Sequence, residues 1–176
     1  MRLNCALLAV ATCVSVLLVT GSAIADDEHG HSNALLKGTY RIFSQVSNVG
    51  STAQLYFTGV ITYDGHGHAR MTDHGTVIDS NNQSNPPSAP SFEETGTFTY
   101  VVKRDGSFTQ EGGFTSNPEG LYTITGIKWV GQISAQGSVL ILSGIIPPES
   151  STFCNFQGCS LRLGSFSATA VRIRHE

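Results

Sequence analysis

The chain has 176 residues, of which 40% are hydrophobic and 13% charged, and its formal net charge is −3 at pH 7. Nucleic acid is excluded as an expected partner, because phosphate binding needs clustered Lys and Arg side chains and the ten basic residues here do not cluster.

The first 25 residues have the layout of a secretory signal peptide. Arg2 precedes an apolar run from Ala6 to Val19, and small residues lead up to Ala25. We predict cleavage after Ala25, a secreted or periplasmic location, and no stable membrane span afterwards. An uncleaved signal anchor and lipidation at Cys13 are the alternatives. Arg2 is the one charged residue of this segment, so the remaining 151 residues carry nine basic and 13 acidic residues and fit a single domain.

Residues 26–36 are interpreted as a flexible leader, because Asp26 to Asn33 is acidic and lacks apolar periodicity. His29 and His31 in this leader form an H-x-H pair that could bind metal weakly.

The domain from residue 37 to residue 176 reads as strands throughout. Short runs rich in Thr, Val, Ile, Tyr and Phe alternate with Gly, Asn, Asp and Pro, and no stretch has a convincing helical period. The predicted strands are Gly38 to Val46, Gln54 to Tyr63, His68 to Ile78, Gly96 to Val102, Ser107 to Phe114, Leu121 to Ile133, Ser138 to Ile145 and Gly164 to Arg174.

Three tight reversals connect neighbouring strands, at Asp64-Gly65, Asp105-Gly106 and Gln136-Gly137. Sequential hairpins give an antiparallel meander, and closing the sheet removes its exposed edges. We therefore predict an all-β fold, a single antiparallel meander that closes into a barrel of about eight strands.

Two long interruptions, Asp79 to Thr95 and Ile146 to Leu163, contain prolines and are predicted to be loops near a barrel mouth. Between them, strand periodicity predicts that Phe98, Tyr100 and Val102 share the inward face. The strand from Leu121 to Ile133 has bulky residues on both faces, which predicts either a covering loop or a bulge at Gly126 or Gly131.

Several phrases of the first half resemble a family of secreted bacterial proteins of unknown function. They are Leu36 to Tyr40 (LKGTY), Gly59 to Gly67 (GVITYDGHG), Thr95 to Tyr100 (TGTFTY) and Arg104 to Ser107 (RDGS). The resemblance implies a barrel of calycin-like or allene-oxide-cyclase-like architecture and carries no catalytic residues. Cysteines that members of that family often have are replaced here around Ser32 and Asp105, so the resemblance implies no disulfide between those regions.

Cys154 and Cys159 are the only cysteines after the signal segment, and an exported chain meets oxidising conditions. We predict a disulfide between them that shapes a local loop. A redox or metal-binding pair is the alternative, although the spacing of four intervening residues does not favour it.

Candidate metal ligands gather in one hairpin, where Asp64, His66 and His68 could converge at the turn. His74 lies too far along the strand, because six residues span roughly 20 Å. We interpret the turn as a solvated hairpin tip, predict no cofactor and no metal, and keep these three residues as weak candidates.

No catalytic constellation stands out, since the sequence has no G-x-S-x-G nucleophile elbow. Asp73, Glu93, Glu94 and Glu111 could act as acid or base, but no spacing marks a matched carboxylate pair, and we assign them to surface charge. Arg70 shares its strand face with His68 and His74. If Met71 and Val77 face the core, these three polar residues face solvent.

Phe98, Tyr100 and Trp129 are candidate ligand-pocket residues, with ordinary core as the alternative. The leading hypothesis is an exported barrel of unknown function whose interior or mouth binds a small apolar ligand. The alternatives are a barrel enzyme of cyclase or isomerase type and a non-catalytic envelope or extracellular interaction protein with a filled core. Ionisable side chains that point into a cavity would favour the enzyme, and a solid interior would favour the interaction protein.

Overall fold

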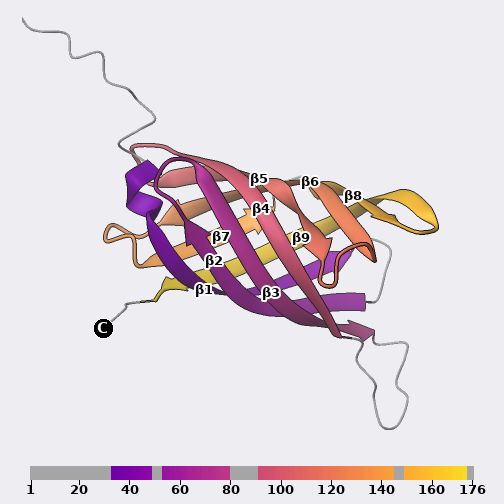
Figure 1. Ribbon diagram of the computed structural model, residues 1–176. Helices are drawn as coiled ribbons and strands as arrows, with labels where there is room; N and C mark the ends of the chain where they lie inside the picture. The colour runs from indigo at the N-terminus through magenta and orange to yellow at the C-terminus, as the bar shows by residue number, and fades with distance from the viewer. Residues whose placement is uncertain (1–32, 49–52, 80–90, 145–148, 174–176) are drawn as a thin grey trace, which may run out of the picture.

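A closed antiparallel β-barrel forms the body of the protein, seen from the side in Figure 1. The structure, a computed structural model, describes residues 33–48, 53–79, 91–144 and 149–173. Its elements are the 3-10 helix η1 (Ala34–Leu36) and strands β1 (Gly38–Asn48), β2 (Ala53–Tyr63), β3 (His68–Asp79), β4 (Ser91–Val102), β5 (Ser107–Ser116), β6 (Tyr122–Ile133), β7 (Val139–Gly144), β8 (Glu149–Asn155) and β9 (Gly158–Arg172).

The predicted meander is confirmed, and it closes because β9 returns to pair with β1. The barrel has eight strand positions rather than nine, since β7 and β8 follow one another along a single position. β7 pairs with the second half of β6 and β8 with its first half, and both pair with β9. Closure leaves the barrel without a free sheet edge.

One predicted loop is wrong over most of its length. Residues 146–163 were assigned to a loop because of Pro147 and Pro148, which lie outside the described residues, but Glu149 to Leu163 forms the β8–β9 hairpin. The other predicted loop is wrong at its end, because β4 begins at Ser91. In both places the described strands resume sooner than the sequence suggested.

Inward and outward residues alternate as predicted in β4, where Phe98, Tyr100 and Val102 are buried. The predicted bulge is also present. β6 inserts one residue between Ile124 and Ile127 relative to β5, and Gly126 there has a φ of +76°. Because a bulge shifts the side-chain parity by one, both Ile124 and Ile127 turn inward.

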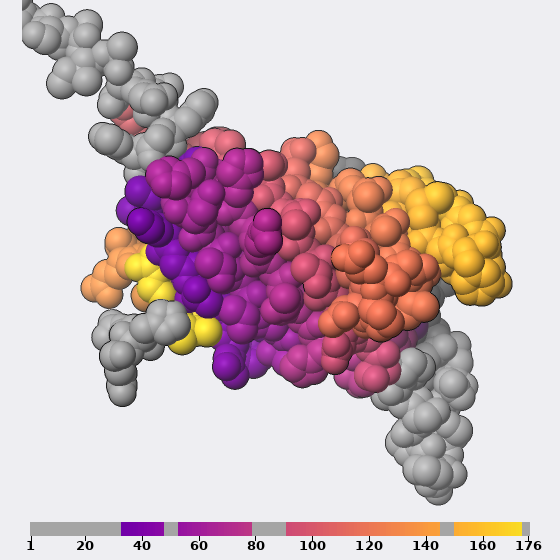
Figure 2. All heavy atoms as spheres, in the orientation of Figure 1, coloured from indigo at the N-terminus to yellow at the C-terminus, as the bar shows by residue number. Residues whose placement is uncertain are grey.

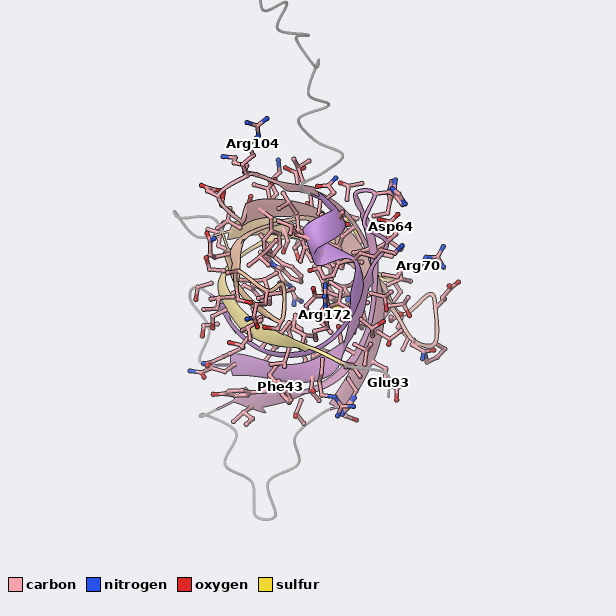
Figure 3. The ribbon with its side chains drawn as sticks, turned by 90° about the vertical axis from the view of Figure 1, so that its left-hand side faces the viewer. Phe43, Asp64, Arg70, Glu93, Arg104 and Arg172 are labelled. Carbon is pink, nitrogen blue, oxygen red and sulfur yellow. A yellow bond between two sulfur atoms is a disulfide. The ribbon has the colours of Figure 1, made fainter. Side chains whose placement is uncertain are left out.

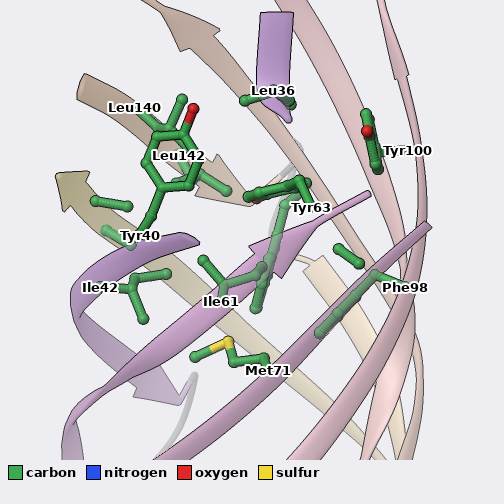
Figure 4. Packing of buried hydrophobic residues seen from close by; sticks show 14 of the residues in the cluster. Leu36, Tyr40, Ile42, Ile61, Tyr63, Met71, Phe98, Tyr100, Leu140 and Leu142 are labelled. Atoms are coloured by element: carbon green, nitrogen blue, oxygen red, sulfur yellow. The ribbon is translucent and has the colours of Figure 1, made fainter. Parts of the chain in front are cut away.

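The closed end of the barrel, where β1 begins and β9 ends, is covered by η1. Leu36 of this helix is fully buried against the inward-facing Tyr63 and its neighbours (Figure 4). Viewed along the axis from this end, Arg172 points toward the middle of the opening, whereas Phe43, Arg70 and Glu93 point away (Figure 3).

Hydrogen bonds fasten this end. Arg172 donates to the backbone oxygens of Leu35 (3.2 Å) and Lys37 (2.8 Å) and to the hydroxyl of Tyr40 (2.9 Å). Asn33 accepts a hydrogen bond from the backbone N–H of Val102 (2.8 Å). Residues 33–36, which the sequence grouped with the leader, thus pack as part of the barrel, while the predicted signal peptide and residues 26–32 lie outside the described residues.

At the opposite end the β8–β9 hairpin projects beyond the barrel (yellow in Figure 2). The predicted disulfide between Cys154 and Cys159 is confirmed and joins two residues that face each other across this hairpin. Phe156 at its tip is 89% exposed. Among the described residues, no helix is long and apolar enough to cross a membrane.

Candidate functional site

A cavity of about 100 Å³ occupies the open end of the barrel, the end where β1 finishes and β2 begins. Seven strands contribute to its wall: β1, β2, β4, β5, β6, β8 and β9. The lining residues are Val46, Leu55, Phe57, Phe92, Glu94, Phe114, Ile124, Ile127, Trp129, Ser151, Arg162, Gly164, Ser165 and Phe166.

Aromatic rings form the floor of this cavity. Trp129 lies parallel to Phe166, with ring centroids 4.1 Å apart and an interplanar angle of 6°, and Phe57 also stacks on Phe166, with its centroid 6.2 Å away. Phe114 completes the floor at 6.0 Å from Trp129. Because Trp129 stacks on both Phe166 and Phe98, these rings cover much of one another's faces, and the floor offers the cavity an apolar surface.

Two carboxylates lie inside the barrel beside this floor. Asp73 of β3 and Glu94 of β4 face each other in the strand register, and they are only 6% and 8% exposed. Glu94 lines the cavity, and Asp73 sits next to it. Neither oxygen of Asp73 has a hydrogen-bond partner among the described residues.

Burial dominates the electrostatics of this pair. It raises the pKa of Asp73 to about 8, and the nearby Glu94 carboxylate adds to the rise. Burial also raises the pKa of Glu94, partly offset by a hydrogen bond from Tyr122. Desolvation and the two carboxylates raise the pKa of the Tyr122 hydroxyl in turn. At neutral pH Asp73 is therefore mostly a neutral acid, because a buried charge without a partner is costly.

The sequence interpretation of these two residues was wrong, because Asp73 and Glu94 were assigned to surface charge. The signal was present in the strand periodicity. Asp73 lies two residues after Met71, which faces the core, and Glu94 lies four residues before Phe98. What periodicity could not supply was the register of β3 against β4, which places the two carboxylates opposite each other.

The other two carboxylate candidates are surface residues, as the sequence indicated. Glu111 forms an exposed ion pair with Lys128, at 3.1 Å from its Nζ. Glu93 accepts a hydrogen bond from the side-chain amide of Asn117 at 3.1 Å. Arg70 also faces solvent, as expected once Met71 is buried.

The three ligand-pocket candidates from the sequence occupy different places. Trp129 lines the cavity. Phe98 is buried behind it, with ring centroids 5.1 Å apart, and does not line the cavity. Tyr100 lies toward the closed end, where its hydroxyl accepts a hydrogen bond from the backbone N–H of Gly65 at 2.9 Å.

The candidate metal ligands at the β2–β3 turn are used differently. The Asp64 carboxylate accepts hydrogen bonds from the backbone N–H groups of His66 (2.6 Å) and His68 (3.0 Å), which hold the turn. Slight burial acts to raise the pKa of Asp64, but these hydrogen bonds outweigh it and the pKa falls below its usual value. Within the described part of the chain, no group of three or more His, Cys, Asp or Glu residues is arranged around a metal-sized site.

Arg162 stands at the rim of the cavity on β9. Its guanidinium lies over the ring of Phe153, 3.7 Å from the centroid, and Phe153 stacks on Tyr122 at 5.3 Å. The rim is thus ordered by side-chain stacking across the hairpin that the disulfide closes.

Comparison with known proteins gives structural likeness only. No family model matches the sequence, and the search of curated proteins finds no match. The chain is similar to EF1p2_mFAP2b bound to DFHBI, with 11% identity over 82% of this chain and 99% of that one and a TM-score of 0.44. It is also similar to the S-type phycobiliprotein lyase CPES from Guillardia theta, with 12% identity over 82% and 92% of the two chains and a TM-score of 0.38. At these TM-scores neither neighbour bears on the function of this chain.

Proposed function

We propose that this protein is an exported barrel that binds a small, largely apolar molecule in the cavity at its open end. The observation that carries the proposal is the cavity itself, walled by five aromatic side chains in a barrel whose other end is filled. Export is inferred from the signal-like first 25 residues and agrees with the disulfide between Cys154 and Cys159.

The volume limits the ligand. Pockets that enclose drug-sized molecules measure roughly 300–1,000 Å³, whereas this one measures about 100 Å³. An apolar cavity of about 150 Å³ is known to hold benzene. The enclosed part of the ligand is therefore no larger than about one aromatic ring, and a lipid-sized molecule would not fit inside.

The sequence supplies a direct reporter of binding, because Trp129 is the single tryptophan and forms part of the cavity floor. Titration with benzyl alcohol, a neutral one-ring probe, is expected to change the Trp129 fluorescence in a saturable way, with a dissociation constant on the order of 1 mM or below.

Two variants locate the probe. Ile124→Phe adds bulk to the cavity wall and should weaken binding, whereas Ile141→Phe adds the same type of ring on the outer face of β7, where Ile141 is 62% exposed, and should not. A fluorescence change of equal size in both variants would place the probe elsewhere. No saturable change in the wild type would favour a filled barrel that acts through its surface.

One observation favours a second candidate, an enzyme of the isomerase or cyclase type. Glu94 lines the cavity, and beside it the raised pKa of Asp73, about 8, lies near the pH at which a general acid or base works well. The test compares extracts of small molecules from the native host after incubation with wild type and with Glu94→Gln. A compound consumed only by the wild type supports catalysis, and identical chromatograms count against it.

A further inference from the structure

The carboxylates beside the cavity are not explained by the binding of an apolar molecule. Two acidic side chains that face each other inside a barrel destabilise it, both through lost hydration and through mutual repulsion. No positively charged group is among the influences on either pKa. Tyr122 donates a hydrogen bond to Glu94, whereas no donor reaches either oxygen of Asp73 among the described residues.

Asp73 gives the second, independent sign of a missing partner. Its side chain is more than nine-tenths buried, points into the barrel interior and leaves both oxygens without a donor among the described residues. At the closed end the buried hydroxyl of Tyr63 donates to the side-chain oxygen of Gln110 at 2.7 Å, and the side-chain nitrogen of Gln110 is the one other buried polar side-chain atom without a partner among the described residues. Buried polar atoms are nearly always paired, so two unpaired oxygens side by side indicate a donor that the chain itself does not provide.

The aromatic floor indicates what kind of donor fits. Trp129 and Phe166, stacked on each other, border the same cavity that Glu94 lines. Apolar side chains suit the hydrocarbon body of a ligand, and carboxylates accept the N–H groups of an ammonium ion. A site with both features on adjoining walls matches a molecule with a flat apolar body and a positively charged nitrogen.

We propose that the open-end cavity binds a small organic amine, with its apolar body on the aromatic floor and its ammonium group at Glu94 and Asp73. This inference rests on the proposed function and specifies its ligand class. A calcium ion fits less well, since it takes six to eight oxygen ligands, and the described residues at this point offer two carboxylates and the Tyr122 hydroxyl. The guanidinium of Arg162 lies over the ring of Phe153 at the rim, so the inner position beside Glu94 and Asp73 is available to the ammonium group of the ligand.

The test uses three one-ring probes of similar size and different charge: benzylamine, benzyl alcohol and benzoate. Each is titrated into the full mature chain at pH 8, with Trp129 fluorescence as the readout. Benzylamine is expected to bind about tenfold or more tightly than benzyl alcohol, and benzoate most weakly. Calcium chloride is the fourth arm and should not compete with benzylamine.

Isosteric variants assign the charge preference to the pair. Asp73→Asn and Glu94→Gln should each reduce the benzylamine preference to within about threefold while benzyl alcohol still binds. Glu93→Gln, on the outward face next to Glu94, is the matched control and should leave the preference unchanged. A preference that survives both Asp73→Asn and Glu94→Gln would overturn the inference.

The wild type gives a check that needs no variant. Asp73, Glu94 and Tyr122 are the titratable groups that influence one another here, and Arg162 lines the same cavity at its rim. Asp73 must lose its proton to accept an ammonium group as a carboxylate. Benzylamine affinity should therefore rise from pH 6 to pH 8, and benzyl alcohol affinity should stay constant. Equal, pH-independent binding of both probes would contradict the proposal that the ligand is an amine, but not the proposal of an apolar binding site. No binding of either probe would contradict both proposals.

Discussion

The two ends of the barrel use the same strands in opposite ways. At the closed end the inward side chains fill the interior, and the edge-to-face rings of Tyr40, Tyr63 and Tyr100 have their hydroxyls hydrogen-bonded. At the open end the rings border a cavity, and neither oxygen of Asp73 has a hydrogen-bond partner among the described residues. Because the alternation of inward and outward residues is the same at both ends, the difference comes from which residues occupy the inward positions.

This contrast separates stability from function within one sheet. Packing and satisfied hydrogen bonds stabilise a fold, whereas cavities and unpaired buried polar groups cost stability and persist where they serve a purpose. We therefore assign the closed end to stability and the open end to ligand binding, and the predictions below compare matched changes at the two ends.

The largest difference is expected from removing one aromatic ring at each end. Tyr63→Ala should destabilise the protein by about 3–5 kcal/mol, because Tyr63 is fully buried between other rings. Phe92→Ala removes a ring that is only partly buried, at the edge of the cavity, and should cost about 1 kcal/mol or less. Urea unfolding monitored by circular dichroism measures both. Equal losses would mean that the open end is packed as tightly as the closed end.

The next effect is on the pH dependence of stability. The pKa of Asp73 is about 8 in the folded protein against 3.8 as its ordinary value, so between these values the folded state holds a proton that the unfolded chain has released. Stability should therefore fall as the pH rises through this range, by about 1.4 kcal/mol per pH unit.

Asp73→Asn should remove this contribution. The free energy of unfolding of the variant, relative to that of the wild type, should therefore rise by about 2–3 kcal/mol from pH 5 to pH 7. The outward-facing Glu93→Gln serves as the control. Unfolding curves collected at both pH values test the expectation, and a constant difference between wild type and Asp73→Asn would contradict the buried, protonated state of Asp73.

A smaller effect is expected from the hydrogen bonds of Arg172 at the closed end. Arg172→Met keeps much of the side-chain volume but removes the donors to Leu35, Lys37 and Tyr40, and should cost about 1.5–3 kcal/mol. Arg70→Met, on the outer face, should change stability by no more than about 0.5 kcal/mol. Benzyl alcohol binding should persist in both variants. If Arg172→Met abolished it, the two ends would not be independent.

Much of the fold could be predicted from the sequence, because local patterns determine it. Alternation identified six of the strands closely and placed Phe98 inward, and turn glycines such as Gly65 and Gly106 marked the hairpins. The β8–β9 hairpin was missed because Pro147 and Pro148 predict a loop, and that prediction extended as far as Leu163 although the strands begin again at Glu149.

The candidate site was harder to predict, because it depends on which residues of two different strands lie opposite each other. Strand periodicity does not give this register. Trp129 was identified from its size alone, and it does line the cavity. Asp73 and Glu94 are 21 positions apart, and only the register of β3 against β4 brings them together. The parity of Met71 would have placed Asp73 inside, but an acidic residue in a half-polar strand is usually on the surface, and that expectation prevailed.

The most direct test of the contrast between the two ends is a crystal structure of the protein under xenon pressure. Xenon enters apolar cavities without needing polar contacts. We predict one xenon site at the open end, bordered by Phe57, Trp129 and Phe166, and none among Tyr40, Tyr63 and Leu36 at the closed end. Xenon at the closed end, or none beside Trp129, would contradict the assignment of the open end as the binding site.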